Sequence, residues 1–160
     1  MKSIFKLFTL SLCMIFLVAC QQNEKAPKSA SANLSHAASP KEEYDLQERC
    51  GKRAEEYFKR EYGNGISNTK DGQSMTVYTN HYNKKLNKCF ILLTTTNVTY
   101  KDKKVSSSTF RSLYDINENK EYGIFFKRDN DNFVFECKVS DKVCNSEDEW
   151  EALIKPYMEE

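Results

Sequence analysis

The chain begins with a short apolar segment that limits which residues are left to fold. Lys2 and Lys6 precede a mostly apolar run, Leu7 to Val18, and the small residue Ala19 stands directly before Cys20. A positive flank, an apolar middle and a small residue at the end are the three parts of a secretory signal peptide. As a helix the run would extend about 18 Å, too short for the roughly 30 Å of a bilayer core. We therefore predict a cleaved signal and no transmembrane helix here.

The end of this segment, Leu17-Val18-Ala19-Cys20, resembles the lipobox of bacterial prolipoproteins: an aliphatic residue, a tolerant position, a small residue and an obligatory cysteine. The resemblance implies that diacylglycerol is attached to the Cys20 thiol, that residues 1–19 are removed, and that the new amino terminus is acylated, for example with palmitate. Two or three acyl chains hold a protein on a membrane far more firmly than one does. Gln21 stands where lipoproteins kept at the inner membrane tend to carry Asp. The resemblance thus implies the outer membrane, with the protein facing the periplasm.

The mature chain divides into two regions by composition. Residues 20–43 are rich in Ala, Ser and Lys and poor in large apolar side chains. Such a segment cannot bury enough surface to offset its ordering entropy, so we predict a lipidated cysteine followed by a disordered tether. Residues 44–160 contain all the Phe, Tyr and Trp side chains after the signal and are long enough for one core. We predict that they form a single α+β domain.

Helical patterns stand at both ends of this domain. Apolar residues recur at steps of three and four before Gly63-Asn64-Gly65, with charged residues between them. Near the carboxyl end, Ser146 and Glu149 form a capping box, and Trp150, Leu153, Ile154 and Tyr157 follow at helical spacing. Both segments predict amphipathic helices that pack on the rest of the domain.

Between the helices, stretches rich in β-branched and aromatic residues alternate with short polar turns. This pattern predicts an antiparallel meander. We expect four or five strands, with Ile66 to Gln73 as a polar connection ahead of them. The expected strands are Met75 to Tyr82, Lys88 to Tyr100, Val105 to Ile116, Glu121 to Arg128 and Phe133 to Val139.

Four cysteines lie in the predicted domain: Cys50, Cys89, Cys137 and Cys144. An even number in an exported domain indicates disulfides, and four cysteines allow three pairings that sequence alone does not separate. We favour Cys50 with Cys89, which joins helix to sheet, and Cys137 with Cys144, which closes a short loop. No Cys-x-x-Cys motif supports a zinc site or a thioredoxin-like redox site.

The sequence predicts no cofactor, no metal and no nucleic-acid partner. The 24 Lys and Arg residues nearly balance the 23 Asp and Glu residues, whereas nucleic-acid binders carry a strong basic excess. Asp129 opens a stretch like the start of a calcium loop, but Val134 and Ser140 stand where Gly and a bidentate Glu are needed. There is no Gly-x-Ser-x-Gly elbow, and the disulfide interpretation leaves no free thiol to pair with His81.

A candidate binding surface is formed by Tyr78, His81, Tyr82, Lys84 and Lys85, because exposed Tyr and Lys side chains suit recognition better than chemistry. The run from His81 to Phe90 and the ending Pro156 to Glu160 resemble uncharacterised bacterial envelope proteins, a resemblance that implies no function. We therefore favour a membrane-anchored envelope lipoprotein whose non-catalytic domain binds a protein or cell-wall partner.

Two alternatives stay open at this point. One is a small periplasmic hydrolase that uses acidic residues such as Glu118, Glu121 or Glu136, since paired carboxylates need not be near each other in sequence. The other is an inhibitor or immunity-type lipoprotein, which differs from the favoured function only in its partner.

Overall fold

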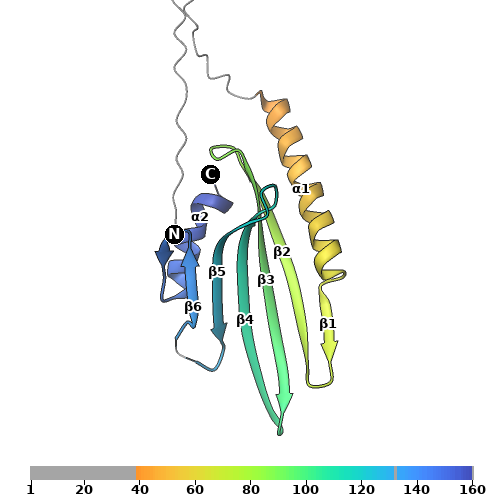
Figure 1. The fold of residues 1–160 in the computed structure, drawn as a ribbon, viewed down its shortest axis with the longest axis vertical. Coiled ribbons are helices and arrows are strands. Elements are labelled where there is room, and N and C mark those ends of the chain that lie inside the picture. Colours follow the sequence, from red (N-terminus) through yellow and green to blue (C-terminus); the bar gives the residue numbers. More distant parts are fainter. Residues whose placement is uncertain (1–38, 132, 160) are drawn as a thin grey trace, which may run out of the picture. The chain divides into compact units, whose positions relative to one another are not determined.

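A computed structural model describes residues 39–131 and 133–159. The predicted signal, the lipobox with Cys20 and most of the predicted tether lie outside these residues. The described chain forms two helices and one antiparallel sheet, in which every strand pairs with its neighbours in the sequence (Figure 1). Within these residues, neither helix is both long and apolar enough to cross a membrane.

The sheet is a meander of seven strands between two helices, which confirms the predicted α+β class. The prediction of four or five strands is too low, because β1 and β7 carry only exposed side chains and so lack the alternation by which strands are recognised. The elements are α1 (Pro40–Tyr62), β1 (Ile66–Thr69), β2 (Gly72–Asn83), β3 (Lys88–Lys101), β4 (Lys104–Asp115), β5 (Lys120–Arg128), β6 (Glu136–Val139), β7 (Lys142–Val143) and α2 (Glu147–Met158).

Helix α1 begins earlier than the predicted domain boundary. Ser39 is its N-cap: the Ser39 hydroxyl accepts from the Glu42 amide, and the Glu42 carboxylate accepts from the Ser39 amide. Pro40 fits the first helical position because its missing N–H needs no partner there. Residues 40–43, assigned to the tether on composition, are therefore the first turn of α1.

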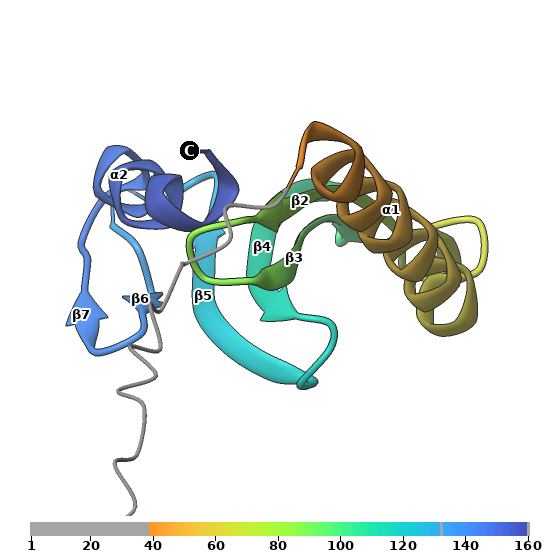
Figure 2. The same cartoon turned by 90° about the horizontal axis from the view of Figure 1, so that it is seen from above.

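The two helices cover opposite faces of the sheet. Successive side chains of a strand point to opposite faces, and β3 shows the consequence. Cys89 and Ile91 pack with residues of α1, whereas Phe90 between them belongs to the cluster that contains Trp150 of α2. Seen from above, α1 lies beside β2 and β3 and α2 lies near β5 and β6 (Figure 2).

The larger core lies under α2. Trp150 and Ile154 are buried there with Phe90, Leu113 and Phe125. Gly123 of β5 makes room for the indole, since a Cβ at this position would lie 3.0 Å from a ring atom of Trp150. The apolar face predicted for the carboxyl-terminal segment is the face that docks.

Both predicted disulfides are confirmed. Cys50 of α1 is bonded to Cys89 at the start of β3, with 5.4 Å between their Cα atoms. Cys137 of β6 is bonded to Cys144 just after β7, with 5.0 Å between their Cα atoms. One bridge therefore fastens α1 to the sheet, and the other closes the β6–β7 hairpin.

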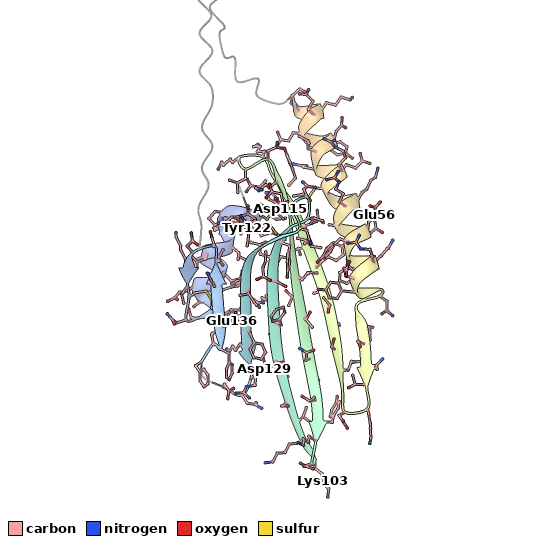
Figure 3. All side chains as sticks on the ribbon, viewed as in Figure 1. Glu56, Lys103, Asp115, Tyr122, Asp129 and Glu136 are labelled. Atoms are coloured by element: carbon pink, nitrogen blue, oxygen red, sulfur yellow. A yellow bond between two sulfur atoms is a disulfide. The ribbon has the colours of Figure 1, made fainter. Side chains whose placement is uncertain are left out.

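The β3–β4 hairpin extends beyond both helices, and Lys103 lies at its tip (Figure 3). On this part of the sheet the face that α2 covers elsewhere is open. Met75, Val77, Tyr100 and Val105 are about half exposed on it. Threonine and serine side chains fill most positions between them, which keeps the surface polar despite its apolar members.

Candidate functional site

A pocket of about 150 Å³ opens between α1, the β2–β3 turn and the β4–β5 turn. The apolar part of its lining comes from Leu46, Tyr82 and the Cys50–Cys89 disulfide. The polar part comes from Arg49, Arg53, Asn87 and Asn117. The pocket thus combines two guanidinium groups and two amides with an apolar wall.

The disulfide decides which side chains of α1 reach the pocket. Cys50 is buried against the sheet, so Arg49 and Arg53, which precede and follow it in the sequence, lie at the edge of the contact between α1 and the sheet. They are one helical turn apart and therefore lie on the same side of the helix. Arg53 donates from Nη1 to Oδ1 of Asn117, which ties α1 to the β4–β5 turn.

The β4–β5 turn is held by a buried carboxylate. Asp115 is fully buried, and its Oδ1 accepts a hydrogen bond from the backbone N–H of Asn117 at 3.0 Å. Its Oδ2 lies 2.7 Å from Nζ of Lys88, which also contacts Glu118 at 2.8 Å. The hydrogen bond to Asp115, and to a smaller extent the one to Glu118, raises the pKa of Lys88 above its usual range. Asn117 is therefore presented to the pocket by a fixed turn.

The β2–β3 turn contributes Asn87 in a defined orientation. Its backbone is left-handed, with φ of 51°, a conformation that Asn tolerates better than most residues. Its Oδ1 accepts from the hydroxyl of Tyr82 at 2.9 Å. The phenol of Tyr82 thus fixes the side chain of Asn87 in the lining of the pocket.

A second depression of about 450 Å³ continues along α1, and it shares Arg53 and Asn117 with the pocket. We call the two together the α1 groove. In Figure 3, Glu56 on α1 and Asp115 at the end of β4 mark the two elements beside it. The guanidinium of Arg60 lies 5.4 Å from the ring centre of Tyr57, and burial raises the pKa of that phenol. The remaining lining residues are Glu56, Glu61, Ile116 and Asn119.

The surface predicted from Tyr78, His81, Tyr82, Lys84 and Lys85 is not one surface. Tyr82 is buried, and the ring of Tyr78 lies 4.6 Å from that of Phe58 of α1. Both tyrosines point to the face that α1 covers, whereas alternation directs His81 to the other face.

The two lysines follow β2 in the turn to β3. Lys84 forms an ion pair with Glu43 at 3.0 Å, and Lys85 is exposed. Of the five, Tyr82 alone lines the α1 groove. The prediction went wrong because polar neighbours in the sequence suggested exposure, although a helix lies over β2.

The acidic residues considered for a hydrolase have separate partners, and Glu136 lies far from Glu121. Glu118 is held by Lys88, and Glu121 accepts from the Tyr114 hydroxyl at 2.7 Å. Glu136 pairs across from Phe126, about 17 Å along β5 from Glu121. Carboxyl pairs in glycosidases are about 5 to 9.5 Å apart. Among the described residues, no group of three or more His, Cys, Asp or Glu side chains could hold a metal ion.

The prediction from sequence missed the four residues of the polar lining of the 150 Å³ pocket, which are Arg49, Arg53, Asn87 and Asn117. One signal was available, because Lys52 and Lys59 each have Glu four residues earlier, whereas Arg53 has Arg49 there. A helical cation without an acidic neighbour at that spacing is a candidate for a role outside the helix. Nothing in the sequence marked the two asparagines, since Asn is common in turns.

No family model, no curated protein and no solved structure matches the chain.

Proposed function

We propose that the protein is a lipid-anchored lipoprotein of the bacterial envelope, held at the outer membrane and facing the periplasm. Its domain binds a protein or cell-wall partner without catalysing a reaction. The lipobox resemblance ending at Cys20 supports the anchor. The two disulfides support an oxidising compartment, where such bonds form and persist.

The observation that carries the binding function is the α1 groove. Its lining is rich in Arg, Tyr and Asn, and arginine and tyrosine are enriched where proteins contact partners. Both cysteines in its wall are joined in a disulfide, so neither is a nucleophile. The groove offers contacts and charge, which suits recognition.

The lipid anchor is tested by replacing Cys20, whose sulfur would carry the lipid. Cys20→Ser should abolish incorporation of labelled palmitate and leave an uncleaved precursor, because the thioether cannot form. Cys13→Ser is the matched control, since it removes a cysteine from the same segment and leaves the lipobox intact. Equal labelling of the Cys20→Ser protein would exclude the lipoprotein assignment.

The partner is tested by photo-crosslinking in intact cells. A photoreactive amino acid at Asn119, on the exposed rim of the groove, should give a defined adduct. The same probe at Lys103, at the far end of the β3–β4 hairpin, is the control and should not. A cell-wall partner would appear as a high-mass adduct that a muramidase digests, and an inhibited enzyme as a protein adduct. The proposal fails if Asn119 gives no adduct, or the same adducts as Lys103.

A further inference from the structure

The two guanidinium groups of the pocket form no ion pair with a carboxylate of the described residues. Within residues 39–131 and 133–159, no acidic oxygen lies within 4.0 Å of Arg49 or Arg53. Glu48, directly before Arg49, is engaged by Lys52 at 2.7 Å, and Glu55 by Lys59. Two like charges one helical turn apart destabilise each other. An anion between them would remove that repulsion.

The two amides of the pocket also present donors. A side-chain amide has one carbonyl oxygen that accepts and an NH₂ group that donates twice. The Asn87 oxygen accepts from Tyr82 at 2.9 Å, and the Asn117 oxygen accepts from Arg53. Both oxygens are thus engaged inside the protein, which leaves the two NH₂ groups for a ligand. The polar lining of the pocket therefore offers N–H donors and positive charge.

Carboxylates and phosphates match such a lining, since they are acceptors and guanidinium groups bind them through paired hydrogen bonds. The pocket also has an apolar wall made by Leu46, Tyr82 and the disulfide. Its volume of about 150 Å³ suits an oxyanion carried on a small apolar group. The depression beyond Arg53 contains both cationic and acidic side chains, so a polar chain can continue there.

We propose that this pocket binds an oxyanion, a carboxylate or a phosphate ester, that belongs to the partner of the α1 groove. The proposal rests on the proposed function, because it assigns ligand chemistry to the same groove. Arg49 and Arg53 neutralise the anion, and the amides of Asn87 and Asn117 orient it. The apolar group attached to the anion packs on the disulfide and Tyr82.

The test is titration of the purified full chain, labelled with ¹⁵N and held in a non-ionic detergent. The probes are N-acetyl-alanine, its uncharged amide, and methyl phosphate. We expect saturable shifts of the Asn87 and Asn117 side-chain resonances with at least one of the two anions and none with the amide. Binding should weaken as salt rises, because exposed charges are screened. If the resonances shift with N-acetyl-alanine alone, the ligand group is a carboxylate. If they shift with methyl phosphate alone, the ligand group is a phosphate ester.

Variants separate this site from general charge effects. Arg49→Gln and Arg53→Gln should each weaken anion binding about tenfold or more, since each removes a charge-assisted contact. Lys59→Gln is the matched control: it removes the same charge from the same helix outside the pocket, and should leave affinity unchanged. No shift with either anion, equal shifts with the amide, or equal weakening by Lys59→Gln would overturn the proposal.

The two proposals can fail separately. If the Asn119 adduct forms in cells but no anion binds, the oxyanion assignment is wrong and partner binding stands. If anions bind as expected but Asn119 gives no specific adduct, the pocket is an anion site and the proposed function is wrong.

Discussion

At the scale of single residues, Asp115 is the charge on which the β4–β5 turn depends. Its main cationic partner is Lys88, at 2.7 Å. Lys88→Met keeps the length of the side chain but leaves a buried carboxylate uncompensated. Breaking a buried ion pair in this way should lower the free energy of unfolding by about 3 kcal/mol, measured by urea denaturation.

Lys120→Met is the control for this change. Lys88 and Lys120 both lie over the ring of Tyr122, at 5.7 Å and 5.1 Å from its centre, but Lys120 forms no ion pair with a described residue. We expect its effect to stay within about 0.5 kcal/mol. Equal losses in the two variants would show that contact with Tyr122, and not the ion pair, matters.

Tyr114 gives a prediction for alkaline solution. Burial, and to a smaller extent the hydrogen bond to Glu121, raises the pKa of its phenol above the usual value of about 10. The fold therefore favours the neutral phenol, and this stabilisation is complete below pH 10 and is lost as the pH rises toward the folded-state pKa. Tyr114→Phe should lose stability less steeply than wild type above pH 10 in pH-resolved denaturation.

The control for Tyr114→Phe is Tyr100→Phe. Tyr100 is 57% exposed and lies on the β3–β4 hairpin. Tyr100→Phe should therefore lose stability above pH 10 as steeply as wild type does. A Tyr114→Phe slope that matches wild type would mean that other groups cause the alkaline loss, among them Lys88, whose pKa is also raised.

At the scale of elements, the two disulfides should contribute unequally to stability. Their cysteines are 39 and 7 residues apart in the sequence. Each bridge stabilises the fold, by about 4 kcal/mol for Cys50–Cys89 and about 2 kcal/mol for Cys137–Cys144, because it lowers the entropy of the unfolded chain. Replacing Cys50 and Cys89 together by Ala should lower the melting temperature more than the same change at Cys137 and Cys144. The reverse order in calorimetry would contradict this.

One element shows why face assignments from alternation can fail. Strict alternation along β5 places Tyr122 on the face opposite Phe125. The register between β4 and β5 shifts beside Leu113, and Tyr122 instead packs at 5.2 Å from the ring of Phe90, in the core under α2. A single bulge thus changes the face of a side chain without any clear mark in the sequence.

At the scale of the whole molecule, the fold was more predictable than the groove. A meander needs only local pairings, and a polar turn between two β-rich stretches predicts most of them. The pairing of Cys50 with Cys89 was favoured because it joins helix to sheet, although the sequence allowed two other connectivities. The groove depends on Arg53 meeting Asn117, which lies 64 residues away, and on which atom of each amide is engaged. Neither property leaves a pattern in the sequence.

The bridge between Cys50 and Cys89 also decides how the domain bears a mechanical load. A pull on the chain ahead of Pro40 can unwind α1 only as far as Cys50, where the covalent bond stops it. Beyond that point the tension passes into β3, an inner strand that pairs along its length with β2 and β4. The helix segment that carries Arg53 lies on the protected side of the stop. A protein tethered by its amino-terminal side could therefore keep the Arg53 side of the groove in shape while under tension.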